Sequence, residues 1–173
     1  MAGNPLFMRD VSLTLTIGAD PALEVNCDVH TVEVVTTPGD EVQYQTLCPD
    51  GSFSEVGRSS YALHIVAAQD WSTDGLARVL WENEGEQAEF RYQAHGADVA
   101  TADAPSDTIP GVMGTIRLIA PSYGGEADTY AELDVTLPCA TKPELVTAAF
   151  PASMSAGVQH GDEETTDREE AAA

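Results

Sequence analysis

The amino-acid sequence predicts a mainly β protein, an antiparallel β-sandwich or open barrel with one flanking α-helix at about residues 72–84. About eight segments alternate apolar and polar residues, as strands with one buried face do. Only residues 69–85 carry apolar side chains at helical spacing. The length of 173 residues and the 43% hydrophobic content suit a single domain with a hydrophobic core.

The first part of the chain is expected to form strands separated by turns. Residues 11–17 alternate with apolar side chains on one face, and residues 22–30 resume this pattern after a break. Residues 32–47 contain a Pro-Gly pair between two alternating runs, which predicts an antiparallel hairpin. Residues 48–60 carry Pro, Asp, Gly and Ser at short intervals, so we expect a long ordered loop.

Residues 61–69 are largely apolar on both faces, which predicts a central strand covered on both sides. The predicted helix follows. Ser72 is a favoured N-cap, and Trp71 is expected to pack on Leu76 as a hydrophobic staple. Asp74 would lie in the first turn, where the helix dipole favours an acid.

The same helix carries an apolar stripe that must be buried. Leu76, Val79 and Leu80 have the spacing of one helix face, and Gly85 is expected to end the helix. At about 10–12 residues such a helix is marginal alone in water, so it must dock on the sheet.

The second half again reads as strands. Alternation over residues 86–95, 112–120 and 128–138 predicts three of them, and residues 139–152 are expected to hold a short closing segment. In residues 128–138 the inward set comprises Ala131, Leu133, Val135 and Leu137.

Three regions follow from these assignments. Residues 1–10 form an N-terminal arm, residues 11–149 the β-sandwich domain, and residues 150–173 an acidic tail that is expected to be disordered. The first ten residues lack the apolar core of a secretory signal, and no apolar run approaches the roughly 18 residues of a membrane span. We therefore expect no membrane association and a protein made in the cytosol.

The charge is strongly acidic, with 29 Asp and Glu against 7 Lys and Arg. Residues 162–170 contribute a net of −5, which leaves −17 of the total of −22 for the rest of the chain. Such a surface repels phosphates, which excludes tight nucleic-acid binding. Two interpretations remain open: simple solubility, or a surface that another polyanion passes without adhering.

The sequence contains no recognisable catalytic or metal motif. Cys27 and His30 resemble half of a metal site, but in an extended strand they point to opposite faces. The chain has three cysteines, Cys27, Cys48 and Cys139, and we expect them to be buried thiols. A disulfide between two of them is the alternative. Loosely held calcium on the acidic surface also stays open. Nucleophile-elbow and phosphate-loop patterns are missing, so we expect no enzyme, cofactor or bound metal.

Three segments, residues 25–57, 61–85 and 123–145, together resemble the major tail protein, or tail tube protein, of long-tailed phages, especially of the actinobacteriophage type. The resemblance lies in their order: hairpin, Cys-Pro loop, strand, "QDW" helix, Gly-Gly turn and "AELDVTLP" strand. It implies a β-sandwich whose copies form hexameric rings, stacked into a virion tube that conducts DNA. Implied partners are further copies, tail-tip and terminator proteins, and the tape-measure protein; assembly is expected in the host cytoplasm.

The resemblance also suggests residues for assembly. Lumen candidates are polar residues on outward strand faces: Glu33, Glu132, Asp134 and Thr136. Candidates for contacts between rings or subunits are Thr36, Pro38, Gly39, Asp40, Phe53, Arg58, Trp71 and Trp81. Ordinary solvent-facing polarity is the alternative for each polar residue.

Two other functions compete with a tail tube. One is another assembly role, such as a tail terminator or a head decoration protein. The other is a ligand-binding β-sandwich, for example for carbohydrate. The low aromatic content of 6% disfavours that role, because sugar sites usually present stacked aromatic rings.

Overall fold

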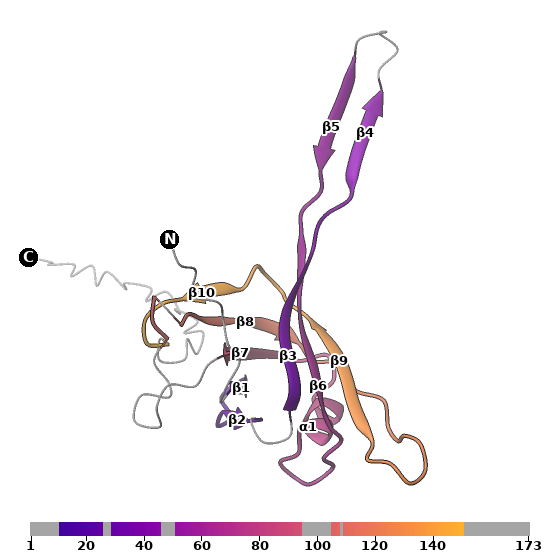
Figure 1. The fold of residues 1–173 in the computed structure, drawn as a ribbon, viewed down its shortest axis with the longest axis vertical. Coiled ribbons are helices and arrows are strands. Elements are labelled where there is room, and N and C mark those ends of the chain that lie inside the picture. The colour runs from indigo at the N-terminus through magenta and orange to yellow at the C-terminus, as the bar shows by residue number, and fades with distance from the viewer. Residues whose placement is uncertain (1–10, 26–28, 46–50, 95–104, 108, 151–173) are drawn as a thin grey trace, which may run out of the picture.

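The chain forms an antiparallel β-sandwich with a long two-stranded extension (Figure 1). The computed structural model describes residues 11–25, 29–45, 51–94, 105–107 and 109–150. These residues contain one helix, α1 (Leu76–Glu82), and ten strands. The strands are β1 (Ser12–Ile17), β2 (Leu23–Glu24), β3 (Val29–Thr37), β4 (Glu41–Gln45), β5 (Ser52–Val56), β6 (Ser60–Ala68), β7 (Gln87–Gln93), β8 (Gly111–Arg117), β9 (Glu132–Pro138) and β10 (Glu144–Val146).

Two sheets form the sandwich. One has five strands in the order β10-β8-β7-β1-β2, and the other has three in the order β3-β6-β9. All pairs are antiparallel, and neither sheet closes into a barrel. After β9 the chain crosses between the sheets, where Ile116 and Cys139 form a bridge. The predicted mainly β, antiparallel sandwich with one helix is therefore confirmed.

The core lies between the two sheets, because alternate residues of each strand point inward. On β9 the inward residues Leu133, Val135 and Leu137 are buried while the intervening residues are exposed, as the alternation predicted. Phe90 of β7 is fully buried, and the hydroxyl of Tyr92 donates to the carbonyl of Val32 at 3.1 Å. This bond joins the two sheets and gives a buried hydroxyl its partner.

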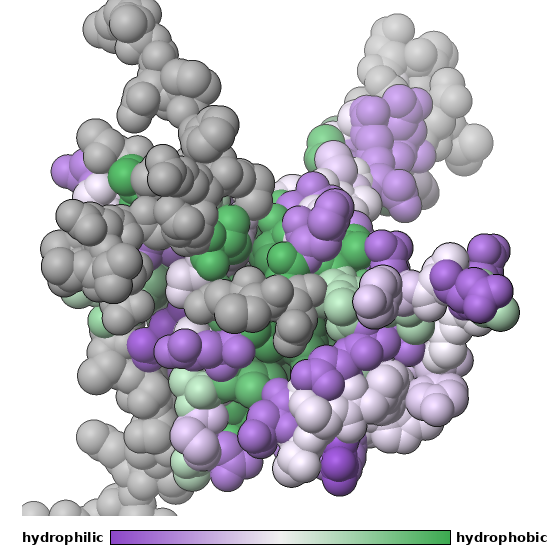
Figure 2. All heavy atoms as spheres, turned by 60° about the horizontal axis from the view of Figure 1, so that its bottom comes forward, coloured by the Kyte–Doolittle hydropathy of each residue, from purple (hydrophilic) through white to green (hydrophobic). Residues whose placement is uncertain are grey.

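Figure 2 looks toward the end of the molecule opposite the extension and shows hydrophobic residues gathered near the middle with hydrophilic residues around them. The helix packs into this core through Leu76, Ala77 and Leu80, which are all buried, while Val79 is only half-buried. The predicted stripe is thus partly corrected, since Ala77 takes the place expected for Val79.

The helix is shorter than predicted, and Ser72 is not its N-cap. The backbone N–H and the hydroxyl of Ser72 both donate to the carboxylate of Asp70, at 2.8 Å each, which makes a tight turn before the helix. Gly75 occupies the N-cap position without a side-chain bond. Asp74 therefore precedes the helix instead of lying in its first turn. Gly85 has the expected left-handed backbone at φ 88°, although Asn83 is the C-cap.

The largest correction concerns residues 32–60. The expected hairpin within residues 32–47 does not form, because β3 pairs with β6 over Val29–Thr37, and β4 pairs with β5. The expected loop over residues 48–60 instead contains strand β5. Strands β3 and β4 run outward and β5 and β6 return, so the segment forms one long hairpin. The Pro-Gly pair lies within one limb of that hairpin, between β3 and β4. There it separates the ladder of β3 with β6 from the ladder of β4 with β5.

Strand β6 is central in its sheet, as predicted, but only one of its faces is fully buried. Leu63, Ile65 and Ala67 face the core, whereas Ala62, His64 and Val66 are half-buried on the outer face. The chain therefore leaves the outer face of the three-stranded sheet partly open to solvent.

Candidate assembly surfaces

The outer part of the long hairpin, which we call the β-arm (β4 and β5), begins at a joint beyond the sandwich. Thr37 and Ser60 form the last pair of the sheet, and Glu41 and Val56 form the first pair of the β-arm. Between these pairs the backbone N–H of Gly57 donates to the carbonyl of Asp40 at 2.9 Å. The ladder is therefore interrupted here but still held by a hydrogen bond.

Gly39 is required at this joint by close backbone packing. A Cβ atom at Gly39 would lie 2.3 Å from the carbonyl carbon and oxygen of Gly57. Real Cβ atoms do not approach backbone so closely, so a larger residue would force the two chain segments apart. Pro38, Gly39 and Asp40 thus set the direction of the β-arm.

The β-arm presents large hydrophobic side chains to solvent. Val42, Tyr44 and Phe53 are 64%, 68% and 66% exposed. Directly opposed residues of an antiparallel pair share a face, and Tyr44 opposes Phe53 while Val42 opposes Glu55. These three side chains therefore lie together on one largely apolar face, whose fourth member is Glu55. Val56 is also exposed, on the opposite face.

Such a β-arm is unusual for a chain on its own. A two-stranded hairpin is marginally stable in water, and β4 and β5 form a sheet of only these two strands. Contiguous exposed apolar side chains on a projecting element are typical of contact surfaces. The sequence predicts Phe53 as a contact residue but does not single out Val42 and Tyr44. The alternation of these two apolar residues with polar ones in residues 41–45 was the signal that could have found them.

Two other predicted contact residues lie where the β-arm meets the sandwich. Thr36 is exposed on β3 opposite Tyr61, and Arg58 is exposed directly after the joint. Arg58 therefore lies at the base of the β-arm, well before its apolar face in the ladder.

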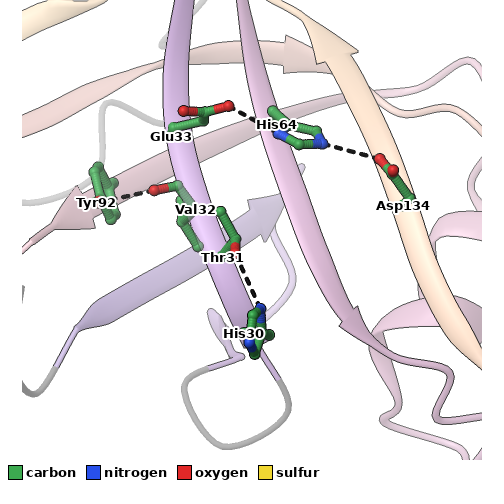
Figure 3. A network of polar contacts seen from close by, with 7 residues as sticks. All are labelled: His30, Thr31, Val32, Glu33, His64, Tyr92 and Asp134. Carbon is green, nitrogen blue, oxygen red and sulfur yellow. Dashed lines mark hydrogen bonds and ion pairs between the residues drawn. The ribbon is translucent and has the colours of Figure 1, made fainter. Parts of the chain in front are cut away.

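The second surface is the outer face of the three-stranded sheet, where the lumen candidates come together. His64, on β6, opposes Glu33 on β3 and Thr136 on β9. Its Nδ1 donates to Glu33 at 3.0 Å and its Nε2 donates to Asp134 at 2.9 Å (Figure 3). Glu132 begins β9 on the same face. The four predicted residues thus share one face, and His64 joins two of them.

The charge state of His64 follows from its partners. An ionised carboxylate only accepts hydrogen bonds, so both bonds form together when the imidazole is protonated and both ring nitrogens donate. The bond to Asp134, followed by the bond to Glu33, raises the pKa of His64 above its usual 6.5. Sequence analysis missed His64, because its partners are 31 and 70 residues away and no local pattern relates them.

The third surface is an aromatic cluster at the helix. The ring of Trp71 makes edge contacts with Trp81 at 5.9 Å and with Tyr123 at 5.0 Å between centroids. Trp81 is 52% and Tyr123 is 77% exposed, whereas Trp71 packs against the core. Trp71 therefore contributes to the core, whereas Trp81 and Tyr123 lie at the surface, and the sequence did not point to Tyr123. The predicted role of Trp71 and Trp81 in contacts between copies stays a prediction.

Gln69 holds the loop beside this cluster. Its side-chain amide donates to the carbonyls of Gly124 and Glu132 and accepts from the N–H of Gly124. The indole N–H of Trp71 donates to the same side chain at 3.3 Å. One glutamine therefore ties the loop between β8 and β9 to the segment before the helix.

The described residues bear on three further predictions, which concern the thiols, a metal site and a membrane span. Cys139 is a free, half-buried thiol whose pKa is raised by burial, whereas Cys27 and Cys48 lie outside the described residues. Within those described residues, no group of three or more His, Cys, Asp or Glu could hold a metal ion. The helix found there is too short and too polar to cross a membrane.

Comparison with known proteins adds a likeness of fold. No protein-family model and no curated protein matches this sequence. Among solved structures, a chain from the helical, C6-symmetric tail of an empty GTA particle aligns with a TM-score of 0.51 and 12% identity, over 80% of this chain and 96% of that one. A chain from the virion of a native gene transfer agent (GTA) particle aligns with a TM-score of 0.47 and 16% identity, over the same shares. At 12% identity, what this chain shares with the chain of the empty-particle tail is its fold.

Proposed function

We propose that this chain is a structural subunit of a phage-like tail, and that its copies form stacked hexameric rings that make the tail tube. The likeness in fold to a chain of a C6-symmetric particle tail supports a role in such a particle. The role is non-enzymatic and needs no cofactor or metal.

The observation that carries the proposal is the β-arm. Its apolar face, with Tyr44 and Phe53 paired on it, has no covering element among the described residues of the same chain. Burying a large apolar side chain contributes roughly 1.5–3 kcal/mol, so covering this face against another copy would stabilise both β-arm and contact. A projecting element that docks on the next subunit suits stacking of rings.

The acidic face of the three-stranded sheet suits the lining of a DNA conduit. Glu33, Glu132 and Asp134 are exposed there, on a chain with a net charge of −22. Phosphates passing such a wall are repelled and do not adhere. We therefore assign this face to the lumen and the β-arm to contacts between rings.

The finer assignment is that of a major tail protein of the actinobacteriophage type. Its partners would be further copies of itself, together with tail-tip, terminator and tape-measure proteins. Its location would be the virion, after assembly in the host cytoplasm.

The test compares wild type with a Tyr44→Ser, Phe53→Ser double variant by negative-stain microscopy and sedimentation velocity. Wild type is expected to form rings and tubes as its concentration rises. The double variant should lose tubes while its melting temperature changes little, because both side chains are about two-thirds exposed in the free chain.

Leu145→Ser is the matched control, because Leu145 is 64% exposed and lies on β10, outside both the β-arm and the loop between β8 and β9. This variant should assemble as wild type does. A wild-type protein that stays monomeric at high concentration would overturn the proposal. Single rings that never stack would favour a terminator instead.

A further inference from the structure

An open groove of about 630 Å³ lies at the base of the β-arm. Its lining comes from the start of β6 and from the segment that leaves β9, and includes Arg58, Ser60, Tyr61, Cys139, Thr141 and Lys142. None of the described residues in this lining is acidic. Burial raises the pKa of the Cys139 thiol, so the thiol is neutral near pH 7. The groove therefore combines two cations with hydroxyl groups and has no anion of its own.

Arg58 and Lys142 differ from the other cations of the described residues in that they line one groove together. Of the seven Lys and Arg of the chain, Arg9 and Arg168 lie outside the described residues, which leaves five. Arg58 and Lys142 are both exposed, and neither forms an ion pair with a described residue. By contrast, Arg78 pairs with Glu82 at 2.8 Å. Two unpaired like charges around one groove favour an anionic occupant.

The opposite end of the molecule carries the complementary charge. The loop between β8 and β9 projects away from the β-arm (Figure 1) and exposes Glu126 and Asp128. The sequence has no Lys, Arg or His between Arg117 and Lys142, so no cation within this loop neutralises them. Gln69 fixes the loop through Gly124, which presents its carboxylates on a tethered segment.

We infer that the groove between Arg58 and Lys142 receives the carboxylates of Glu126 and Asp128 from a second copy of this chain. In rings stacked with the same orientation, as the proposed function requires, the loop end of one copy meets the groove end of the next, so the contact is heterologous and repeats along one axis. The inference rests on the proposed function and names the polar contact that accompanies the apolar β-arm.

A nucleic-acid phosphate is the other anion to consider. The net charge of −22 repels a polyanion and a second copy alike. Stacked copies in the proposed tail are also held by the β-arm contact, which a nucleic acid cannot make. Carboxylates of a second copy are therefore the occupant that fits.

The test is a charge swap followed by sedimentation velocity and microscopy. An Arg58→Glu, Lys142→Glu variant and a Glu126→Arg, Asp128→Arg variant should each weaken self-association at least about tenfold at low salt. The quadruple variant restores opposite charges across the contact, so it should regain association. Added salt should reduce the difference in association between the wild type and each charge-reversed double variant.

The control is Arg78→Glu, Arg117→Glu, which changes the net charge by the same amount outside the groove and should leave association within about threefold of wild type. Circular dichroism spectra must show that each variant keeps the wild-type fold. The contact would be overturned if self-association stayed unchanged when the groove charges were reversed. It would also be overturned if the quadruple variant stayed dissociated. Loss of binding to labelled duplex DNA in the groove variant, with self-association unchanged, would also overturn it.

These outcomes separate the contact from the proposed function. If rings and tubes form whatever the charge of the groove, the contact is overturned but the proposed tail-tube function is still supported. Head-to-tail oligomers that respond to the swap but never form rings or tubes would support the contact and overturn the tail tube.

Discussion

The sandwich and the β-arm are built from the same kind of strand, yet only the sandwich covers its apolar residues. Leu63 and Ile65 of β6 are fully buried, whereas Tyr44 and Phe53, further out along the same hairpin, are about two-thirds exposed. The difference shows that alternation indicates a strand with two unlike faces without indicating what covers the apolar one. In the sandwich the chain itself provides the cover, and in the β-arm we propose that a second copy does.

The largest expected effect is on the sandwich. Leu80→Asp places a charge on a helix residue with 0% exposure, so we expect a loss of about 4 kcal/mol or more and largely unfolded protein. Thermal denaturation followed by circular dichroism measures this. Leu145→Asp makes the same change at a 64% exposed position on β10 and should fold. If Leu80→Asp melted within about 5 °C of wild type, the helix would not belong to the core.

A smaller but selective effect is expected at the joint between the two regions. Gly39→Ala forces a Cβ against the backbone of Gly57, so the β-arm changes direction and assembly should weaken by roughly 1–3 kcal/mol per contact. The melting temperature should change little, because the joint lies outside the core. Sedimentation velocity and thermal denaturation measure the two quantities separately.

Gly18→Ala provides the opposite pattern as a control. Gly18 has a left-handed φ of 57° with open space around it, so alanine there costs about 1 kcal/mol of sandwich stability and should leave assembly intact. Equal effects of the two variants on assembly would contradict the role of the joint.

The smallest expected effect concerns pH and the outer face of the three-stranded sheet. The pKa of His64 is raised in the folded chain by Asp134 and Glu33, so its stabilising contribution is fully present below the unfolded value of about 6.5. That contribution is lost as the pH rises through the raised folded value. Both carboxylates are largely exposed, which limits the effect to about 1 kcal/mol or less.

Comparison with His64→Gln isolates this contribution. The stability advantage of wild type over the variant should be present at pH 5.5 and smaller at pH 8.5, and NMR titration of the imidazole reports the folded pKa directly. A folded pKa at or below 6.5 would contradict the two hydrogen bonds.

Sequence alone determined the properties that depend on nearby residues. The alternation in β9 correctly identified its buried face, and the spacing of Leu76 and Leu80 correctly identified a docked helix. Local competition explains the errors at the helix start, since the Ser72 hydroxyl donates to the carboxylate of Asp70, whereas at an N-cap its oxygen would accept from N–H groups of the first turn.

Only the tertiary structure decided which segments pair over long distances. A Pro-Gly pair between alternating strands fits a turn and a joint equally well, and the choice depends on whether β6 is available to pair with β3. The same applies to His64, whose partners come from β3 and β9, and to the groove that Arg58 and Lys142 line together. Local chemistry specifies faces and turns, whereas sheet order depends on which distant strands bury those faces together.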